Sequence, residues 1–218
     1  HSRDTESERA RVLGHVVSGR PLFVTSSVDN LLIPFSKPKD YASGIKTIEW
    51  GGRYPLGDLT GFLLKSGYES VDQIRNKGQF SRRGGILDIF SPQNEKPYRL
   101  EFFDEEVDSI RVFDVLSQVS TEKRMEAVLF PAREFAGDKE SIGQAISEIE
   151  REMDSLDEDS SKELREKYGE MIESLKNGIV SGDIFNLSCY MSNGDLQEYF
   201  RDGSAFVMMD EKRISQRA

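Results

Sequence analysis

The stretch from residue 78 to residue 114 constrains the fold of this chain more than any other segment. Apolar, strand-like segments in it are separated by residues that favour turns and bends: Gly84-Gly85 as a bulge or bend, the loop Ser91–Asn94 with Pro97, and the acidic turn Asp104–Glu106. Because side chains alternate between the two faces of a strand, Leu100 and Phe102 are expected to share a core-facing side. The pattern predicts a β-rich meander.

The other face of the same strand carries Arg99, Glu101 and Phe103. A large aromatic side chain beside an arginine, on a face that a meander normally leaves polar, has the composition of an interface hot spot. The pattern leaves open the alternative that Phe103 packs beneath a loop or a helix.

Two long phrases within this stretch resemble a known family. They are GQFSRRGGILDIF, residues 78–90, and YRLEFFDEEVDSI, residues 98–110. Both are similar to the homology module shared by UvrB and the bacterial transcription-repair coupling factors (Mfd). The resemblance implies a small β-rich domain that binds UvrA, the damage-recognition ATPase of nucleotide excision repair. It also implies partner-binding roles for Arg83, Arg99 and Phe103.

The chain departs from this family at Ser81, where UvrB carries a second arginine. The departure implies one fewer charged contact, unless the adjacent Arg82 replaces it. An alternative role for Arg83 is that of a surface arginine paired with a neighbour such as Asp88. We expect Arg83, Arg99 and Phe103 to form one contiguous, exposed site on which the fold does not depend.

The segments on either side of the meander predict helices and one short strand. Apolar side chains recur at helical spacing in residues 4–17 and again in residues 138–176. The second pattern is interrupted, which predicts two antiparallel helices. Residues 21–25 are predicted to form a buried strand. The resemblance implies an α/β (α+β) fold in which the β-rich domain is inserted between remnants of a degenerate RecA/helicase-like α/β domain. The expected domains are the end of the ATPase-like domain at 1–41, the UvrA-interaction domain at 42–132, and a helical hairpin with an α/β segment at 133–218.

The net charge of the chain argues against a main role in binding nucleic acid. The net charge is −10, and residues 138–176 hold 13 acidic and 6 basic side chains, a net of −7. A nucleic-acid-binding chain normally presents a basic face, although this distribution allows a local basic patch on the sheet domain. The single cysteine and the absence of an apolar run of membrane-spanning length predict a cytoplasmic protein that does not enter a membrane.

The residues needed for catalysis are not evident. No glycine-rich phosphate loop ending in Gly-Lys-Ser/Thr occurs in the sequence, and two histidines with one cysteine suggest neither a metal site nor a Cys–His pair. Asp210-Glu211 lies where UvrB carries an Asp-Glu-Ser-His box, but Lys212-Arg213 follow here. We therefore expect no catalysis, no cofactor and no metal, with Asp210 and Glu211 as a structural relic.

Two hypotheses about function remain. The first is a protein-recognition module of transcription-coupled repair that recruits UvrA, as in the N-terminal region of a coupling factor, which the phrase LFPAREF at residues 129–135 favours. The alternative is a fragment of a UvrB-type excision-nuclease ATPase subunit that handles damaged DNA. In the first case, RNA polymerase and DNA would be bound only by parts of the protein outside this chain. Another domain of the full-length protein could then mask the exposed sheet face.

Overall fold

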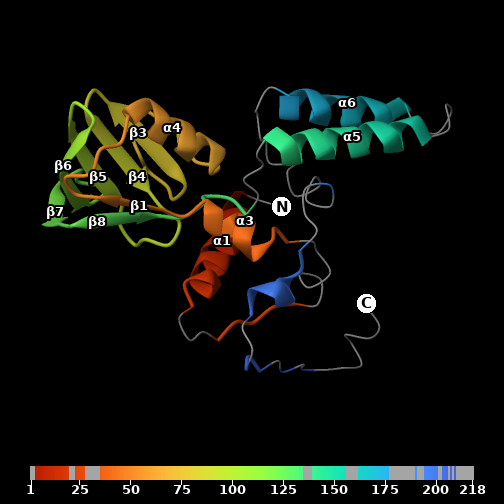
Figure 1. Cartoon of the computed structure of the whole chain (residues 1–218), viewed down its shortest axis with the longest axis horizontal. Helices are drawn as coiled ribbons and strands as arrows, with labels where there is room; N and C mark the ends of the chain where they lie inside the picture. The colour runs from red at the N-terminus through yellow and green to blue at the C-terminus, as the bar shows by residue number, and fades with distance from the viewer. Residues whose placement is uncertain are drawn as a thin grey trace. The chain divides into compact units, whose positions relative to one another are not determined.

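The computed structural model describes residues 3–19, 23–27, 35–134, 139–155, 162–176 and 194–200, together with positions 190, 203–205, 207 and 209. The chain divides into two compact units. One comprises Ser2–Pro21 and Lys39–Ala136, and the other comprises His1, Leu22–Pro38 and Gly137–Ala218. The helices and strands of both are labelled in Figure 1.

The first unit contains two β-sheets, which confirms the predicted β-rich region within an α+β fold. Six strands lie in the order β2-β3-β4-β5-β6-β7, and β1 pairs with β8 in a separate two-stranded sheet. All neighbours are antiparallel except the short parallel pair β2–β3. The strands are β1 Lys46–Glu49, β2 Glu69–Ser70, β3 Gln79–Arg83, β4 Ile86–Phe90, β5 Tyr98–Phe103, β6 Glu106–Phe113, β7 Ser120–Lys123 and β8 Glu126–Leu129.

Two tight turns set the register of the central strands. Gly84-Gly85 reverses the chain between β3 and β4, so this pair closes a hairpin and is not a bulge or bend within one strand. Gly84 has φ +61°, and a Cβ on Gly85 would lie 2.9 Å from the carbonyl oxygen of Phe102. Asp104 turns the chain between β5 and β6 with φ 57°, which aspartate tolerates better than most residues. The acidic turn is therefore where the sequence predicted it.

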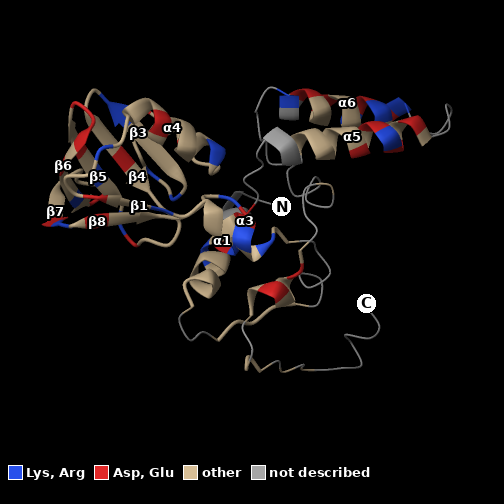
Figure 2. Cartoon of the chain, in the orientation of Figure 1, with Lys and Arg blue, Asp and Glu red and all other residues tan. Residues whose placement is uncertain are grey.

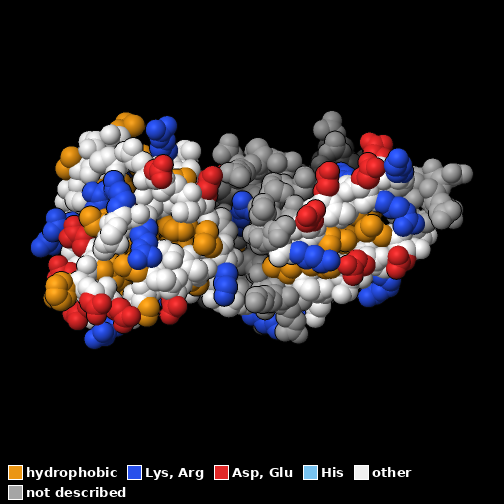
Figure 3. Space-filling view, turned by 90° about the horizontal axis from the view of Figure 1, so that it is seen from above, with side chains coloured by type: hydrophobic (Ala, Val, Ile, Leu, Met, Phe, Trp, Pro, Cys, Tyr) orange, Lys and Arg blue, Asp and Glu red, His pale blue; other side chains and the backbone are white. Residues whose placement is uncertain are grey.

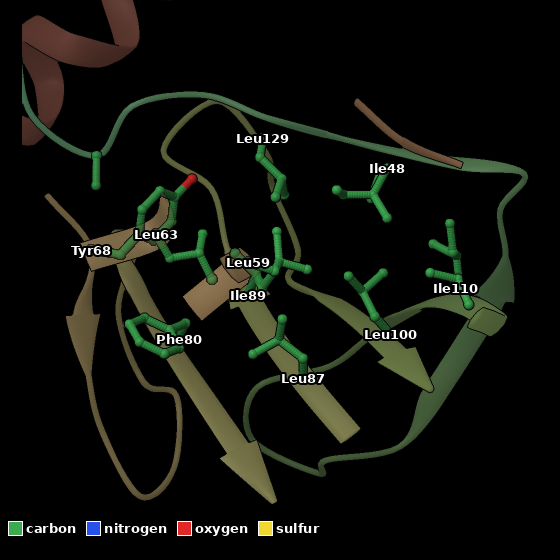
Figure 4. Packing of buried hydrophobic residues seen from close by; sticks show 13 residues of the cluster. Ile48, Leu59, Leu63, Tyr68, Phe80, Leu87, Ile89, Leu100, Ile110 and Leu129 are labelled. Carbon is green, nitrogen blue, oxygen red and sulfur yellow. The ribbon is translucent and has the colours of Figure 1, made fainter. Parts of the chain in front are cut away.

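One face of the six-stranded sheet is covered by helix α4, Leu56–Lys65, and by the β1–β8 pair. The side chains that meet there make the main core, shown in Figure 4: Ile48, Leu59, Leu63, Tyr68, Phe80, Leu87, Ile89, Leu100, Val107, Ile110, Ala127, Leu129 and Ala132. Leu100 is fully buried and Phe102 packs partly buried against the cluster. The predicted core side of β5 is thus confirmed.

A β-bulge divides β6 into two halves. Glu101 lies opposite Ser109, whereas the next residue of β5, Phe102, lies opposite Val107, so Asp108 has no partner on β5. The extra residue lets Val107 and Ile110 both enter the core although they are three positions apart. Simple alternation along β6 does not describe this strand.

Helix α1, Arg3–Val17, packs within the β-rich unit, as does α3, Pro38–Ser43. Ala10 and Leu13 of α1 are buried, and the hydroxyl of Tyr41 donates a hydrogen bond to the carbonyl oxygen of Ala10 at 2.5 Å. Arg9 Nε donates to Glu134 Oε2 at 2.8 Å. These contacts place the predicted helix in a compact unit with residues 39–136, whereas the sequence assigned residues 1–41 to a separate domain. Residues 23–25, the described part of the expected strand at 21–25, have no regular structure.

The second unit contains the predicted helix pair, α5 Lys139–Ser155 and α6 Lys162–Lys176. Ile149, Met171 and Ile172 are buried between the helices. Figure 3 shows hydrophobic side chains in a strip bordered by charged ones, and Figure 2 shows basic and acidic segments mixed along both helices. Such mixing is typical of a solvated helix pair.

The same unit holds a short 3₁₀ helix, Leu196–Tyr199, capped by the side chain of Asp195. Tyr199 is buried there and its hydroxyl donates to the carbonyl oxygen of Ser36 at 2.9 Å. Asp210 and Glu211 lie outside the described residues. None of the helices in the described part of the chain combines the length and apolarity needed to cross a membrane.

Candidate protein-binding surface

The candidate site lies on the face of the six-stranded sheet opposite the main core. Five residues stand directly opposite one another on successive strands from β3 to β7 and so share this face. We call them the cross-strand row: Ser81, Asp88, Arg99, Arg111 and Lys123. The next position along the strands holds Arg83, Ile86, Glu101 and Ser109, and Phe103 follows at the end of β5.

The opposite end of this face is closed by a small apolar cluster. Phe90 and Phe113 pack with Ile74, and Val71 and Val115 lie against them. This cluster buries the sheet up to the cross-strand row. The accessible part of the face therefore runs from the cross-strand row toward the turns at Gly84-Gly85 and Asp104.

Asp88 is the buried centre of the site, because its side chain is only 2% exposed. Arg99 binds it with two hydrogen bonds, from Nε to Oδ1 at 2.7 Å and from Nη2 to Oδ2 at 2.9 Å. Arg83 Nη2 donates to the same Oδ2 at 2.8 Å. One carboxylate thus joins two arginines, and its hydrogen bonds raise the pKa of Arg99 above the usual value.

Arg99 is less exposed than the sequence predicted, with 15% of its side chain accessible. Its guanidinium lies over the ring of Phe113, 4.4 Å from the ring centroid, and its Nη1 donates to the carbonyl oxygen of Gln118 at 3.2 Å. The expectation that Arg99 is exposed is therefore wrong. Contacts with the buried carboxylate of Asp88 and with the apolar cluster hold the Arg99 side chain against the sheet.

Arg83 is half exposed, with 51% of its side chain accessible, and it pairs with Asp88 as the alternative interpretation suggested. Only Nη2 is used in that bond. The exposed remainder of the guanidinium is available to a second carboxylate, so the internal pair and a partner contact are compatible.

Phe103 is 81% exposed at the last position of β5. The alternative in which it packs beneath a loop or helix is therefore wrong. It lies on the same face as Arg99, about 13 Å along the strand at a rise of roughly 3.3 Å per residue. Beside it, Ser109 Oγ donates to Glu101 Oε2 at 2.6 Å, which holds that carboxylate against the sheet.

Arg82 does not take the place of the arginine that UvrB has at position 81. Ser81 is buried and its hydroxyl donates to the carbonyl oxygen of Asp72 at 2.8 Å, beneath the loop that precedes β3. Arg82 lies opposite Leu87, whose side chain enters the core, so it belongs to the other face of β3. The site on this face has one arginine from β3, namely Arg83.

Sequence reasoning missed Arg111, which the cross-strand row places beside Arg99. Alternation with Ile110 and Val112 was the available signal, but the bulge at Asp108 obscures which side chains of β6 share a face with β5.

Among the described residues, no group of three or more His, Cys, Asp or Glu side chains is placed to hold a metal ion.

Comparisons with known proteins relate the β-rich unit to a known domain family. Residues 47–135 match the family model of the UvrB interaction domain. The chain is 46% identical over 92 residues to the transcription-repair-coupling factor of Escherichia coli (strain K12), which is 42% of this chain and 8% of that protein. It is 29% identical over 228 residues to the UvrABC system protein B of Kosmotoga olearia, covering 95% of this chain and 33% of the relative.

A third relative, the transcription-repair-coupling factor of Bacillus subtilis (strain 168), is 27% identical over 220 residues, or 98% of this chain and 19% of that protein. The chain therefore spans a third or less of each of these relatives. Both sheets of the β-rich unit and all three predicted contact residues fall within the matched region, apart from the first residue of β1. Residues 47–135 thus form a UvrB interaction domain, in a chain homologous to the transcription-repair-coupling factors and to UvrB.

Proposed function

We propose that this chain is a protein-recognition module of nucleotide excision repair that recruits UvrA through the sheet face carrying Arg83, Arg99 and Phe103. The observation that carries the proposal is the exposure of Phe103, 81%, on the same face as two arginines joined by a buried carboxylate. An exposed aromatic side chain that shares a sheet face with arginines has the composition of an interface hot spot. The match to the UvrB interaction domain supports the same conclusion.

Each residue has a distinct part in the proposed contact. Phe103 supplies the apolar centre that a partner pocket would desolvate. Arg83 offers its exposed donors to a partner carboxylate. Arg99 has mainly a positioning role. Its bidentate bond fixes the carboxylate of Asp88, and that carboxylate in turn holds Arg83. The contact requires no catalysis and no cofactor.

A titration with purified UvrA tests the proposal. Phe103→Ala should weaken binding by about 2 kcal/mol, roughly thirtyfold, without a change in melting temperature, because the side chain is exposed. Leu64→Ala is the matched control, since Leu64 is an exposed apolar residue of α4 on the other side of the sheet. Binding that is lost equally in both variants, or that the wild-type chain never shows, would contradict UvrA recruitment through this face.

The UvrB-type alternative remains a second candidate because one UvrB relative aligns with 95% of the chain. The sequence, however, supplies no phosphate loop to cradle a triphosphate. ATP hydrolysis that stays with the purified chain through successive columns would favour this second candidate over a pure recognition module.

The proposal extends to regulation of the same face. An exposed phenylalanine that shares a face with two arginines is an interaction surface that another domain of the full-length protein would cover. In that case this chain should bind UvrA more tightly than the full-length protein does. Equal affinities of the two would show that the face is not masked.

A further inference from the structure

The cross-strand row contains three cationic side chains and only one acidic side chain. Arg99, Arg111 and Lys123 stand directly opposite one another on β5, β6 and β7, an arrangement of like charges that destabilises a sheet. The one carboxylate of the row, Asp88, is already shared by Arg99 and Arg83. Two of the three aligned cations therefore have no counter-ion within the row.

No other acidic side chain compensates for them in the described part of the chain. There, Arg111 and Lys123 form no ion pair, and the Nε of Arg111 is buried without a hydrogen-bond partner. Glu122, the acidic residue next to Lys123 in sequence, lies opposite Val112 on the other face and pairs with Arg124 at 2.5 Å. A partly buried guanidinium without an anion is costly unless something else supplies one.

We propose that Arg111, assisted by Lys123, is a further contact residue that binds carboxylates of the protein docking on Phe103 and Arg83. This inference rests on the proposed function and specifies its chemistry. Arg83 and Arg111 are three strand spacings of about 4.8 Å apart across the sheet and two residues, about 6.6 Å, apart along it, so the matching acidic surface of UvrA must span about 16 Å. It would place one carboxylate at Arg83 and another at Arg111.

Carboxylates fit this face better than the phosphates of a nucleic acid. Glu101 and Glu106 border Phe103 on the same strand pair, and a continuous phosphate backbone would pass close to both. Individual partner side chains can approach the arginines while avoiding these acidic neighbours. The net charge of −10 likewise opposes a long polyanion.

Arg111→Gln tests the inference in the UvrA titration, with Arg124→Gln as matched control because it removes the same charge beside the same strand edge but on the other face. We expect Arg111→Gln to weaken binding about tenfold and to reduce its dependence on salt. Arg124→Gln should leave the affinity within about twofold of the wild type. The melting temperature of Arg111→Gln should be unchanged or higher, because a like-charge contact is relieved and no ion pair is lost.

Two further variants keep the test decisive if Arg111→Gln folds poorly. Arg111→Lys retains the charge and should bind better than any neutral variant, and Lys123→Gln should weaken binding about threefold. If Phe103→Ala abolishes binding while Arg111→Gln and Lys123→Gln bind like the wild type, the inference is wrong and UvrA recruitment stands. If the wild-type chain does not bind UvrA, both fall. Binding of a short DNA duplex at physiological salt that Arg111→Gln removes would instead identify a nucleic acid as the occupant and overturn the inference.

Discussion

Asp88 is a buried acid on which two arginines of the sheet converge, and its removal gives the sharpest prediction for a single residue. Asp88→Asn should lower the free energy of unfolding by about 2–3 kcal/mol, because Arg99 would keep its charge in a nearly buried position without a counter-ion. UvrA binding should fall as well, since Arg83 loses the bond that holds it. Urea denaturation measures the first effect and titration of the folded variant the second.

Asp72→Asn provides the control for this change. Asp72 is exposed on the loop before β3 and its contact with Ser81 is made by the backbone carbonyl, so the substitution should alter stability by no more than about 0.5 kcal/mol. Equal denaturation midpoints for both variants would show that the Asp88 pairs add nothing to the fold.

The proposed contact residues could be selected from the sequence only with help from the family resemblance. Alternation placed Arg99 and Phe103 on one face correctly. It could not show that Phe103 is free of a covering loop or that Arg99 is nearly buried, because exposure depends on residues such as Phe113 and Gln118 that are distant along the chain. Arg111 was missed because the bulge interrupts the period of β6.

The loop between β6 and β7 is an element whose stability should depend on pH. Asp114 Oδ1 accepts hydrogen bonds from the backbone N–H of Ser117 at 2.8 Å, from its hydroxyl at 2.9 Å and from the N–H of Leu116 at 3.2 Å. These bonds, led by that from the Ser117 N–H, hold the pKa of Asp114 below its usual value. The folded loop therefore favours the ionised carboxylate. Its contribution is complete above the ordinary pKa and is lost as the pH falls through the lowered one.

Hydrogen exchange at the Ser117 amide measures this effect. In the wild type, protection should be constant above the ordinary aspartate pKa and should decrease, after correction for intrinsic exchange, as the pH falls through the lowered pKa of Asp114. Asp114→Ala should show low protection throughout the range. A wild-type amide whose protection does not change with pH would contradict this account of the loop.

Elements with strong periodicity were predicted well, and elements without it were not. The α5–α6 pair and α1 followed from their apolar stripes. Strand β7 has the sequence Ser-Thr-Glu-Lys and no apolar alternation, so it was not predicted. It forms because β6 offers an edge with which its backbone can pair.

For the molecule as a whole, the packing of α1 on the β-rich unit should contribute directly to stability. Arg9 and Glu134 are both largely buried and lie 125 residues apart in sequence. Arg9→Ala should reduce the free energy of unfolding of this unit by about 2–3 kcal/mol, because Glu134 loses a charged partner in a buried position. Thermal or urea denaturation, followed by a probe in the sheet, measures the change.

Arg11→Ala is the appropriate comparison, because Arg11 pairs only locally with Glu8 and is more exposed. It should change stability by no more than about 0.5 kcal/mol. If the two variants unfold alike, α1 does not stabilise the sheet unit through this pair. The sequence could not reveal the contact, since a local helical pattern does not indicate which distant surface its apolar stripe covers. The domain bounds expected from the resemblance therefore differ from the compact units at the N-terminus.

The carboxylate shared by Arg83 and Arg99 also limits how this surface can evolve. Replacing either arginine alone leaves the other to balance Asp88, and replacing Asp88 alone leaves two cations facing each other. An acid should therefore be retained at position 88 wherever arginines occupy positions 83 and 99 in homologous sequences. For the same reason, a transplant of this surface onto another β-sheet would need to include the buried acid together with the two visible arginines.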